Sequence, residues 1–405
     1  MQFILAFLMF MLGFSVQAES YEQRWNYVRP NMSSDEGVDQ FIDILKQSKD
    51  VGCTHILINE GRYLREADDP VYIARVNKVR EVAKTLGLTI VPAVYPFGYS
   101  GRYLGFNRNL AAGLPVKQMP FVVANGKAMP DMSLAPDLSG LDSTHSGPLK
   151  VRPFTHYRIT FFVMQKPERM SRVISVNSAH RRHMRGHPRV VEVGERFRVT
   201  GTFNSLEADS LGLKIQVEGM VDGLKIEPTG LLMVLRRELT PLVVTSDDGK
   251  KVYEEGRDFE PIYDPVIAAT EGEMTMDHDA PVIVLTKKSR IKNGQTLHVS
   301  FFHAYRVLDE QDVISLEDPA VFDLMKRDIE LCLKVWQPTE LFMNYDEIRV
   351  GGWEKPHVKP GVTLAAHIQK GYEIIQAQAP DARIYTWSDM FTPYHNASPF
   401  EKRKE

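Results

Sequence analysis

Residues 54–94 read THILINEGRYLREADDPVYIARVNKVREVAKTLGLTIVPAV, and they predict a strand, a helix and a second strand. The strands are the apolar runs 54–59 and 88–94. The helix between them begins at Asp69, an N-cap residue followed by a proline, and ends at Gly87, where a left-handed residue is favoured. Strands that alternate with helices of this length predict a parallel sheet, because parallel strands need crossover helices.

The same alternation continues on both sides of this stretch. A strand is expected at 25–29, and a helix follows it. Later in the chain, a helix that begins at Asp318 leads to a strand at 340–345, and a helix at 364–375 leads to a strand at 382–387. The predicted apolar faces of three helices are Val38, Phe41, Ile42 and Leu45; Ile73, Val76, Val79 and Ala83; and Phe322, Met325, Ile329 and Leu333.

The region between these two α/β parts has a different pattern. Residues 119–300 show little helical periodicity and contain short β-rich runs separated by turn residues, which is typical of a β-sandwich. The expected domains are a first barrel part at 19–118, an inserted sandwich at 119–300 and a second barrel part at 301–405. The β-rich runs lie at 157–163, 196–200, 242–244, 282–285 and 296–302.

The predicted fold class is α/β, with a (β/α) barrel of the TIM type that the all-β sandwich interrupts after the third strand. About five strand–helix units can be counted, whereas a closed barrel of this type needs eight parallel strands. We therefore expect an incomplete barrel in a chain that is truncated at Glu405; the alternative is that the sheet is completed otherwise.

The N-terminus and the overall charge indicate where the protein works and what it binds. Residues 1–18 form an apolar run that ends in a small-x-small pattern at Ala18, which predicts a signal peptide and a secreted or periplasmic protein. The run is shorter than the ~20 residues that span a bilayer, so we expect no stable membrane insertion, with a membrane anchor as the alternative. A net charge of -3 predicts no nucleic-acid partner and favours a neutral one.

The two cysteines, Cys53 and Cys332, lie far apart and each at the edge of an apolar segment. They supply neither a disulfide framework nor a metal-ligand cluster. We expect two buried free thiols, no metal and no cofactor. One long-range disulfide in an oxidising compartment is the alternative.

Polar and aromatic residues gather where the predicted strands end. In parallel barrels, the catalytic groups lie at the carboxyl ends of the strands. Carboxylates, amides, an arginine and aromatic rings together suit a sugar, whose hydroxyls need polar partners and whose C–H face packs on rings. The candidate residues are Arg29, Asn59, Glu60, Tyr99, Asp346, Glu347, Arg349, Trp353, Tyr385, Trp387 and Asp389.

Asp346 and Glu347 are the predicted catalytic residues. Glu347 can protonate a glycosidic oxygen if a closed, partly apolar site raises its pKa. Successive side chains on a strand point to opposite faces, so the two carboxylates are not expected to flank one bond as nucleophile and acid. A substrate-assisted route fits better: the acetamido group of the substrate attacks, Asp346 orients it, and Glu347 is the acid/base. The alternative is that the pair only forms ion pairs with Arg349 or Arg29.

The order of these residues resembles the catalytic barrel of family-20 glycoside hydrolases, the β-N-acetylhexosaminidases. The resemblance covers residues 25–100 and 305–395 and leaves the inserted region aside. It implies that Arg29 holds sugar hydroxyls, that the Asp-Glu pair carries out the substrate-assisted chemistry, and that Trp387 forms a wall of the acetamido pocket. The family motif His-x-Gly-Gly-Asp-Glu is replaced here by FMNYDE, so the resemblance is to a distant branch.

Two other functions stay open on the residues alone. One is a non-catalytic glycan-binding protein whose sandwich holds the ligand and whose barrel is a scaffold. The other is a glycosidase for a sugar without an acetamido group, in which Glu60 or Asp389 would serve as the second carboxylate.

Overall fold

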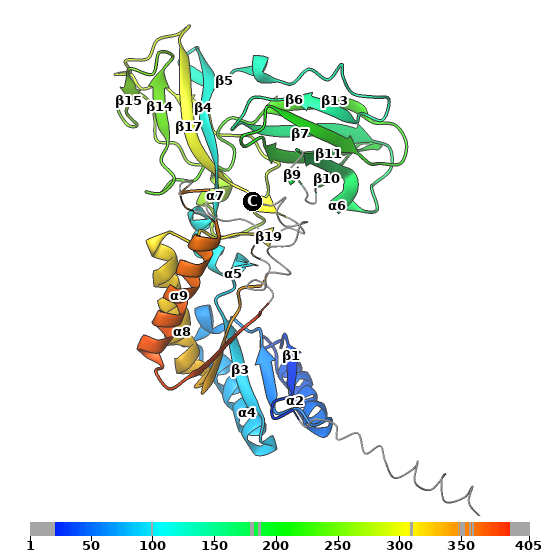
Figure 1. The fold of residues 1–405 in the computed structure, drawn as a ribbon, viewed down its shortest axis with the longest axis vertical. Helices are drawn as coiled ribbons and strands as arrows, with labels where there is room; N and C mark the ends of the chain where they lie inside the picture. The colour runs from blue at the N-terminus through cyan, green and yellow to red at the C-terminus, as the bar shows by residue number, and fades with distance from the viewer. Residues whose placement is uncertain are drawn as a thin grey trace, which may run out of the picture. The chain divides into compact units, whose positions relative to one another are not determined.

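The computed structural model is a mixed α/β protein with a curled five-stranded sheet and several further β-sheets (Figure 1). The chain forms two compact units, Met1–Ala93 with Leu331–Phe342 and Val94–Glu330 with Met343–Glu405. The structure describes residues 21–98, 100–178, 182–184, 188–307, 311–346, 348, 353–355, 358 and 360–388.

The first unit contains most of the five-stranded sheet and the helices that follow its first strands. Its strand order is β1-β2-β3-β20-β21, and the β1/β2 and β2/β3 pairs are parallel, as the alternation of strands and helices predicts. The elements are β1 (Trp25–Val28), α2 (Asp35–Asp50), β2 (His55–Ile58), α3 (Tyr63–Glu66), α4 (Pro70–Leu86), β3 (Thr89–Val94) and β20 (Glu340–Met343); β21 (Arg383–Thr386) belongs to the second unit.

Helix α4 has the predicted ends, but one residue of its predicted buried face is wrong. The Asp69 carboxylate accepts a hydrogen bond from the Val71 N–H at 2.8 Å, and Gly87 has a φ of 63° at the C-cap. The predicted Val76, Val79 and Ala83 are buried, but Ile73 is only half-buried. Tyr72 is the fourth buried residue of the helix instead. Tyr72 can be buried because its hydroxyl donates to a carboxylate, described below.

The strands of the first unit have two chemically different faces. The Asn26 side-chain amide donates to the Ser48 hydroxyl on α2 at 2.9 Å, so this face packs on the helices. Trp25 points the other way and stacks on His55, with ring centres 4.7 Å apart. We call this second face the inner face; by strand alternation it also carries Tyr27 of β1.

The β-rich region of the second unit contains two β cores. Two four-stranded sheets, β10-β11-β7-β13 and β6-β12-β8-β9, bury a common core, while the six-stranded sheet β15-β14-β17-β4-β5-β16 has its own. Each of the five predicted β-rich runs overlaps a strand, although residue 242 lies outside β14 and only the middle of 282–285 belongs to β16. Their bounds are β4 (Gly113–Ala124), β5 (Lys127–Pro130), β6 (Gly147–Lys150), β7 (His156–Val163), β8 (Ile174–Asn177), β9 (Arg182–Met184), β10 (Arg189–Val193), β11 (Arg196–Asn204), β12 (Ser210–Ile215), β13 (Asp222–Pro228), β14 (Val243–Ser246), β15 (Val252–Tyr253), β16 (Ile283–Val284) and β17 (Thr296–Ala304).

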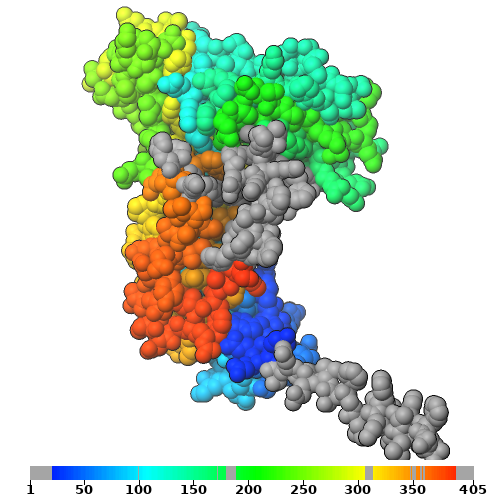
Figure 2. Space-filling view, viewed as in Figure 1, coloured from blue at the N-terminus to red at the C-terminus, as the bar shows by residue number. Residues whose placement is uncertain are grey.

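Short elements and two long helices complete the described fold. The long helices are α8 (Pro319–Trp336) and α9 (Pro360–Gln378), and they lie side by side in both views, with α9 in orange at the surface (Figure 2). On the predicted face of α8, Met325 and Ile329 are buried, but Phe322 and Leu333 are only half-buried. The short elements are α5 (Gly101–Leu104), η1 (Arg108–Leu110), η2 (Met132–Leu134), α6 (Met170–Val173), α7 (Pro265–Ala268), β18 (Arg306–Val307) and β19 (Gln311–Asp312).

The thiol predictions can be compared with the structure directly. Cys53 and Cys332 are both free, as expected, but only Cys332 is fully buried. Within the described ranges, no helix has the length and apolar character needed to cross a membrane. The predicted signal peptide at 1–18 lies outside the described residues.

Candidate functional site

Three polar groups meet at the carboxyl ends of the first two strands. The Tyr27 hydroxyl accepts hydrogen bonds from Arg29 Nε at 3.0 Å and from Asn59 Nδ2 at 2.9 Å. The Arg29 guanidinium carbon lies 5.7 Å from the centre of the Tyr27 ring, within the range of cation–π attraction. Tyr27 is 43% exposed. The structure thus brings the predicted Arg29 and Asn59 together and adds Tyr27 to them.

Strand alternation is the sequence signal that could have identified Tyr27. A residue two positions before Arg29 on the same strand points to the same face. The rule on strand ends selects the last residues of a strand, so it did not predict the aromatic hydroxyl two positions earlier.

Glu60 is not part of this group. Its side chain points to the helices and is 3% exposed. One carboxylate oxygen accepts from the Tyr72 hydroxyl at 2.6 Å and from Trp336 Nε1 at 3.4 Å, and the other accepts from the Arg62 N–H at 2.8 Å. Burial and the neighbouring Glu60 charge raise the pKa of Tyr72. Asn59 and Glu60 are consecutive, so only one of them can face inward.

The second unit places further predicted residues around the end of β20. Trp387 Nε1 donates to the side-chain oxygen of Asn344 at 3.1 Å, and 36% of Trp387 is exposed. The Tyr385 hydroxyl accepts from the Arg383 guanidinium at 3.4 Å. Asp346 is half-buried. The amide Asn344 was not among the predicted site residues; like Tyr27, it lies two positions before one of them.

An aromatic cluster packs around Tyr345, the second residue after β20. Tyr345 is fully buried and stacks on Phe97, with ring centres 5.2 Å apart. His367 of α9 meets Phe97 edge-on at 4.4 Å and shares a hydrogen bond of 2.7 Å between its Nδ1 and the Leu316 carbonyl. Burial lowers the pKa of His367 to about 4, so this ring is neutral at pH 7. The residue before Asp346 is therefore packed in the core.

A buried carboxylate fixes the end of β3. Asp328 of α8 accepts from the Tyr103 hydroxyl at 2.5 Å and from the Tyr95 N–H at 3.1 Å. Tyr95 has a φ of 62°, a conformation that is costly for a bulky residue and needs such support. Burial and Asp328 raise the pKa of Tyr103. The spacing of apolar residues could not predict that Asp328 is buried, because a charged side chain in a helix is expected to be exposed.

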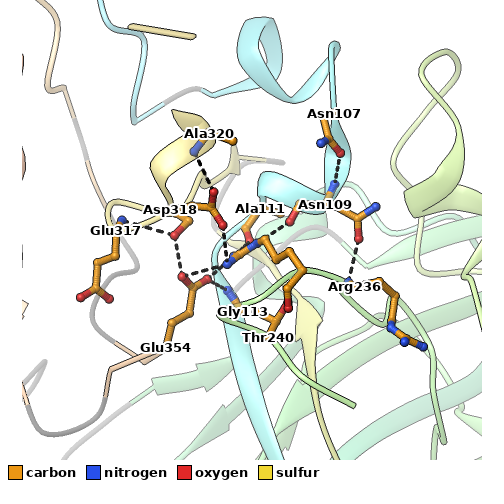
Figure 3. A network of polar contacts seen from close by, with 12 residues as sticks. Asn107, Asn109, Ala111, Gly113, Arg236, Thr240, Glu317, Asp318, Ala320 and Glu354 are labelled. Atoms are coloured by element: carbon orange, nitrogen blue, oxygen red, sulfur yellow. Dashed lines mark hydrogen bonds and ion pairs between the residues drawn. The ribbon is translucent and has the colours of Figure 1, made fainter. Parts of the chain in front are cut away.

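A buried ionic network lies elsewhere in the second unit (Figure 3). Glu354 accepts hydrogen bonds from the Gly113 N–H at 2.7 Å and from the Ser315 hydroxyl at 2.5 Å. Arg237 donates to the same carboxylate at 2.5 Å, and its other terminal nitrogen lies 3.3 Å from Asp318. The Arg237 and Glu354 side chains are only 8% and 5% exposed. Each charge is paired, as buried charges must be.

Trp353 is the residue before Glu354 of this network. It packs against the buried Ala112 and Val313. Nearby, burial raises the pKa of Glu317, and Lys355 at 3.6 Å partly opposes the effect. The half-buried Trp353 thus has packing partners, and its assignment as a binding residue stays a prediction.

Four predicted site residues lie outside the described residues: Tyr99, Glu347, Arg349 and Asp389. Their assignments stay predictions. In the described part of the chain, no group of three His, Cys, Asp or Glu side chains could hold a metal ion.

No protein-family model matches this chain, and a search of curated proteins finds no significant match. The function is therefore inferred from the residues and their placement.

Proposed function

We propose that the protein is a glycoside hydrolase that acts on a β-linked amino sugar or related glycan. The observation that carries the proposal is the meeting of Arg29, Tyr27 and Asn59 in the first unit. A guanidinium, a phenol and an amide at the carboxyl ends of two parallel strands suit the hydroxyls and the C–H face of a sugar. In the second unit, the half-exposed Trp387 beside Asn344 adds a similar pairing of ring and amide.

The fold that accompanies this function is a (β/α) barrel of the TIM type. We assign the five strands of the curled sheet to it and treat the β-rich region as an insertion after the third strand. The two four-stranded sheets with a common core are the part of the insertion that fits a sandwich.

The proposed mechanism is substrate-assisted and retaining. The acetamido oxygen of the sugar attacks C1 while Glu347 donates a proton to the departing glycosidic oxygen, which forms a cyclic intermediate. Glu347 then takes a proton from water as that water attacks C1, the bond between C1 and the acetamido oxygen breaks, and the configuration is retained. Asp346 orients the acetamido N–H throughout. By resemblance, Arg29 holds hydroxyls and Trp387 lines the acetamido pocket.

The decisive measurement is hydrolysis of aryl β-N-acetylglucosaminide by the full chain and three variants. Glu347→Gln and Asp346→Asn should each lower kcat at least ~100-fold, since removal of general acid/base catalysis costs that much. Glu330→Gln, which changes an exposed carboxylate on α8, is the matched control and should retain wild-type activity. Equal rates for wild type and Glu347→Gln would remove Glu347 from the mechanism.

The same assay separates the alternatives. Turnover of aryl β-glucoside as fast as the N-acetyl substrate would indicate a glycosidase that needs no acetamido group. Sugar binding by calorimetry without any turnover would indicate a glycan-binding protein.

A further inference from the structure

A polar pocket lies in the second unit, at the turn between β14 and β15 and beside the start of β17. These three strands are neighbours in the six-stranded sheet (Figure 1). The pocket has a volume of about 420 Å³, within the range of ~300–1,000 Å³ that is usual for small-molecule sites. Its lining includes Ser246, Asp247 and Asp248 from the turn and Gln295 and Thr296 from the start of β17. The proposed catalytic mechanism uses none of them.

Tyr253 of β15 lines the same pocket and contributes a hydroxyl that has no hydrogen-bond partner among the described residues. The residue is only 5% exposed. The Lys251 ammonium and the Arg290 guanidinium lie 5.4 Å and 5.8 Å from the centre of its ring. Burial raises the pKa of Tyr253, so the phenol keeps its proton at pH 7. An almost enclosed side chain thus offers a hydroxyl to a molecule in the pocket.

The turn after β14 supplies hydrogen-bond acceptors. Hydrogen bonds from the Ser246 hydroxyl at 2.7 Å and the Lys250 N–H at 3.1 Å lower the pKa of Asp248, so this carboxylate is charged at pH 7. Asp247 is exposed, and its carboxylate lies 3.6 Å from His298 Nε2. A carboxylate has about four lone-pair sites, so both groups can accept further hydrogen bonds.

The start of β17 adds hydrogen-bond donors. The Gln295 side-chain oxygen accepts from the Lys292 N–H at 2.9 Å, which leaves the two N–H donors of its amide for another partner. The Thr296 hydroxyl forms no hydrogen bond within the described ranges. The pocket therefore combines carboxylate acceptors with amide and hydroxyl donors.

We propose that this pocket is a sugar-binding site additional to the proposed catalytic site. A sugar hydroxyl both donates and accepts, so neighbouring hydroxyls can donate to Asp247 and Asp248 and accept from the donors opposite. A metal ion or an ammonium group would pair with the carboxylates and leave those donors unused. Only the choice of an N-acetylglucosamine glycan as the first ligand rests on the proposed function.

The first test measures binding in the full chain with Arg29→Ala, which removes the guanidinium of the candidate site in the first unit. The ligands are the β-1,4-linked tetramers of N-acetylglucosamine and of glucose, titrated by saturation-transfer NMR. At least one should bind with a Kd of about 1 mM or below. Adding Tyr253→Phe should weaken binding about 3-fold to 10-fold, as the loss of one hydrogen bond does, and adding Asp247→Asn should weaken it at least about 10-fold.

Tyr263→Phe is the matched control. Tyr263 belongs to the same β-rich region, is 62% exposed and is not part of the pocket lining. This change should leave the Kd unaltered. Thermal melts should show that Tyr253→Phe folds normally, since the hydroxyl that it removes has no partner among the described residues.

Two binding results would overturn the inference. One is an equal Kd with and without Tyr253→Phe and Asp247→Asn. The other is that neither tetramer binds at concentrations up to about 10 mM. An equal loss in Tyr263→Phe would also contradict it, because the effect would then not belong to the pocket.

The hydrolysis assay separates this inference from the proposed function. In the chain with Arg29 intact, Tyr253→Phe should retain the wild-type kcat on aryl β-N-acetylglucosaminide, because the pocket takes no part in the reaction. If the wild type shows no turnover, the hydrolase is wrong and the binding results still decide on the pocket. Slower turnover by Tyr253→Phe would make the pocket part of the reaction site, and the inference of an additional site would be wrong.

Discussion

At the scale of single residues, Gly371 of α9 shows how tightly the core behind Asp346 is packed. A Cβ atom at this position would lie 2.6 Å from the Tyr345 hydroxyl, 2.9 Å from Met325 Cε and 3.1 Å from the Tyr95 ring. Gly371→Ala should destabilise the protein by about 1–3 kcal/mol, as overpacking does. Chemical denaturation measures this free energy of unfolding.

Gly361 is the control in the same helix. A Cβ atom there meets nothing within 4 Å. Gly361→Ala should be neutral or stabilise by up to about 1 kcal/mol, because alanine favours helix. Equal losses for both variants would contradict the packing argument.

Removal of the hydroxyl should change the stability of the protein differently at two buried tyrosines. Tyr103 donates to the buried Asp328, so Tyr103→Phe leaves a carboxylate with one fewer donor and should cost about 1–3 kcal/mol. The Tyr345 hydroxyl is buried and has no hydrogen-bond partner among the described residues. Tyr345→Phe should therefore be neutral or slightly stabilising. Thermal melts of the two variants check the contrast, and a larger loss for Tyr345→Phe would contradict it.

At the scale of secondary structure, helix α4 depends on its N-cap. The Asp69 carboxylate accepts from the Val71 N–H, an otherwise unpaired donor of the first turn. Asp69→Ala should destabilise the protein by about 1 kcal/mol. Urea unfolding measures the change.

The neighbouring Asp68 provides the comparison for this cap. It makes an exposed ion pair with Lys334 at 2.5 Å. Such pairs contribute little, so Asp68→Ala should have a smaller effect than Asp69→Ala. A larger loss of stability for Asp68→Ala would show that the ion pair contributes more than the cap.

At the scale of the whole molecule, two buried histidines link the two β cores of the second unit. His156 of β7 and His303 of β17 stack with ring centres 3.7 Å apart. Asn204 Nδ2 lies 2.9 Å from His303 Nε2, and Thr229 Oγ1 lies 2.9 Å from His156 Nδ1. Burial lowers the pKa of His303 to about 4 and holds that of His156 well below its usual range, helped by His303 and Arg158. Both rings are neutral in the folded protein.

Stability should therefore fall in acid. Histidine in the unfolded chain titrates near 6.5, so the contribution of His303 is complete above about pH 6.5 and is lost as the pH falls toward about 4. Between pH 7 and 5, the wild type should lose about 2 kcal/mol more than His303→Gln. Unfolding curves for both proteins at the two pH values check this; parallel losses would contradict it.

Local chemistry made much of the first unit predictable. Residues 54–94 carry their own signals in an N-cap, a helix-ending glycine and apolar runs, and these act over a few residues of chain. The strands, helix α4 and the parallel pairing follow from them. The convergence of Arg29 and Asn59 followed from the rule on strand ends, although the same rule selected Glu60, which points the other way.

The sequence by itself thus predicted the four long helices, the strands of the five-stranded sheet, five of the β-rich runs and the polar character of the strand ends. Only the tertiary structure decided which partners meet: Asp328 with Tyr103, His156 with His303, and Arg237 with Glu354. The physical reason is the separation along the chain over which each interaction acts. Capping and periodicity act between residues near in sequence, whereas a buried charge or ring finds its partner across a core that exists only after the chain has folded.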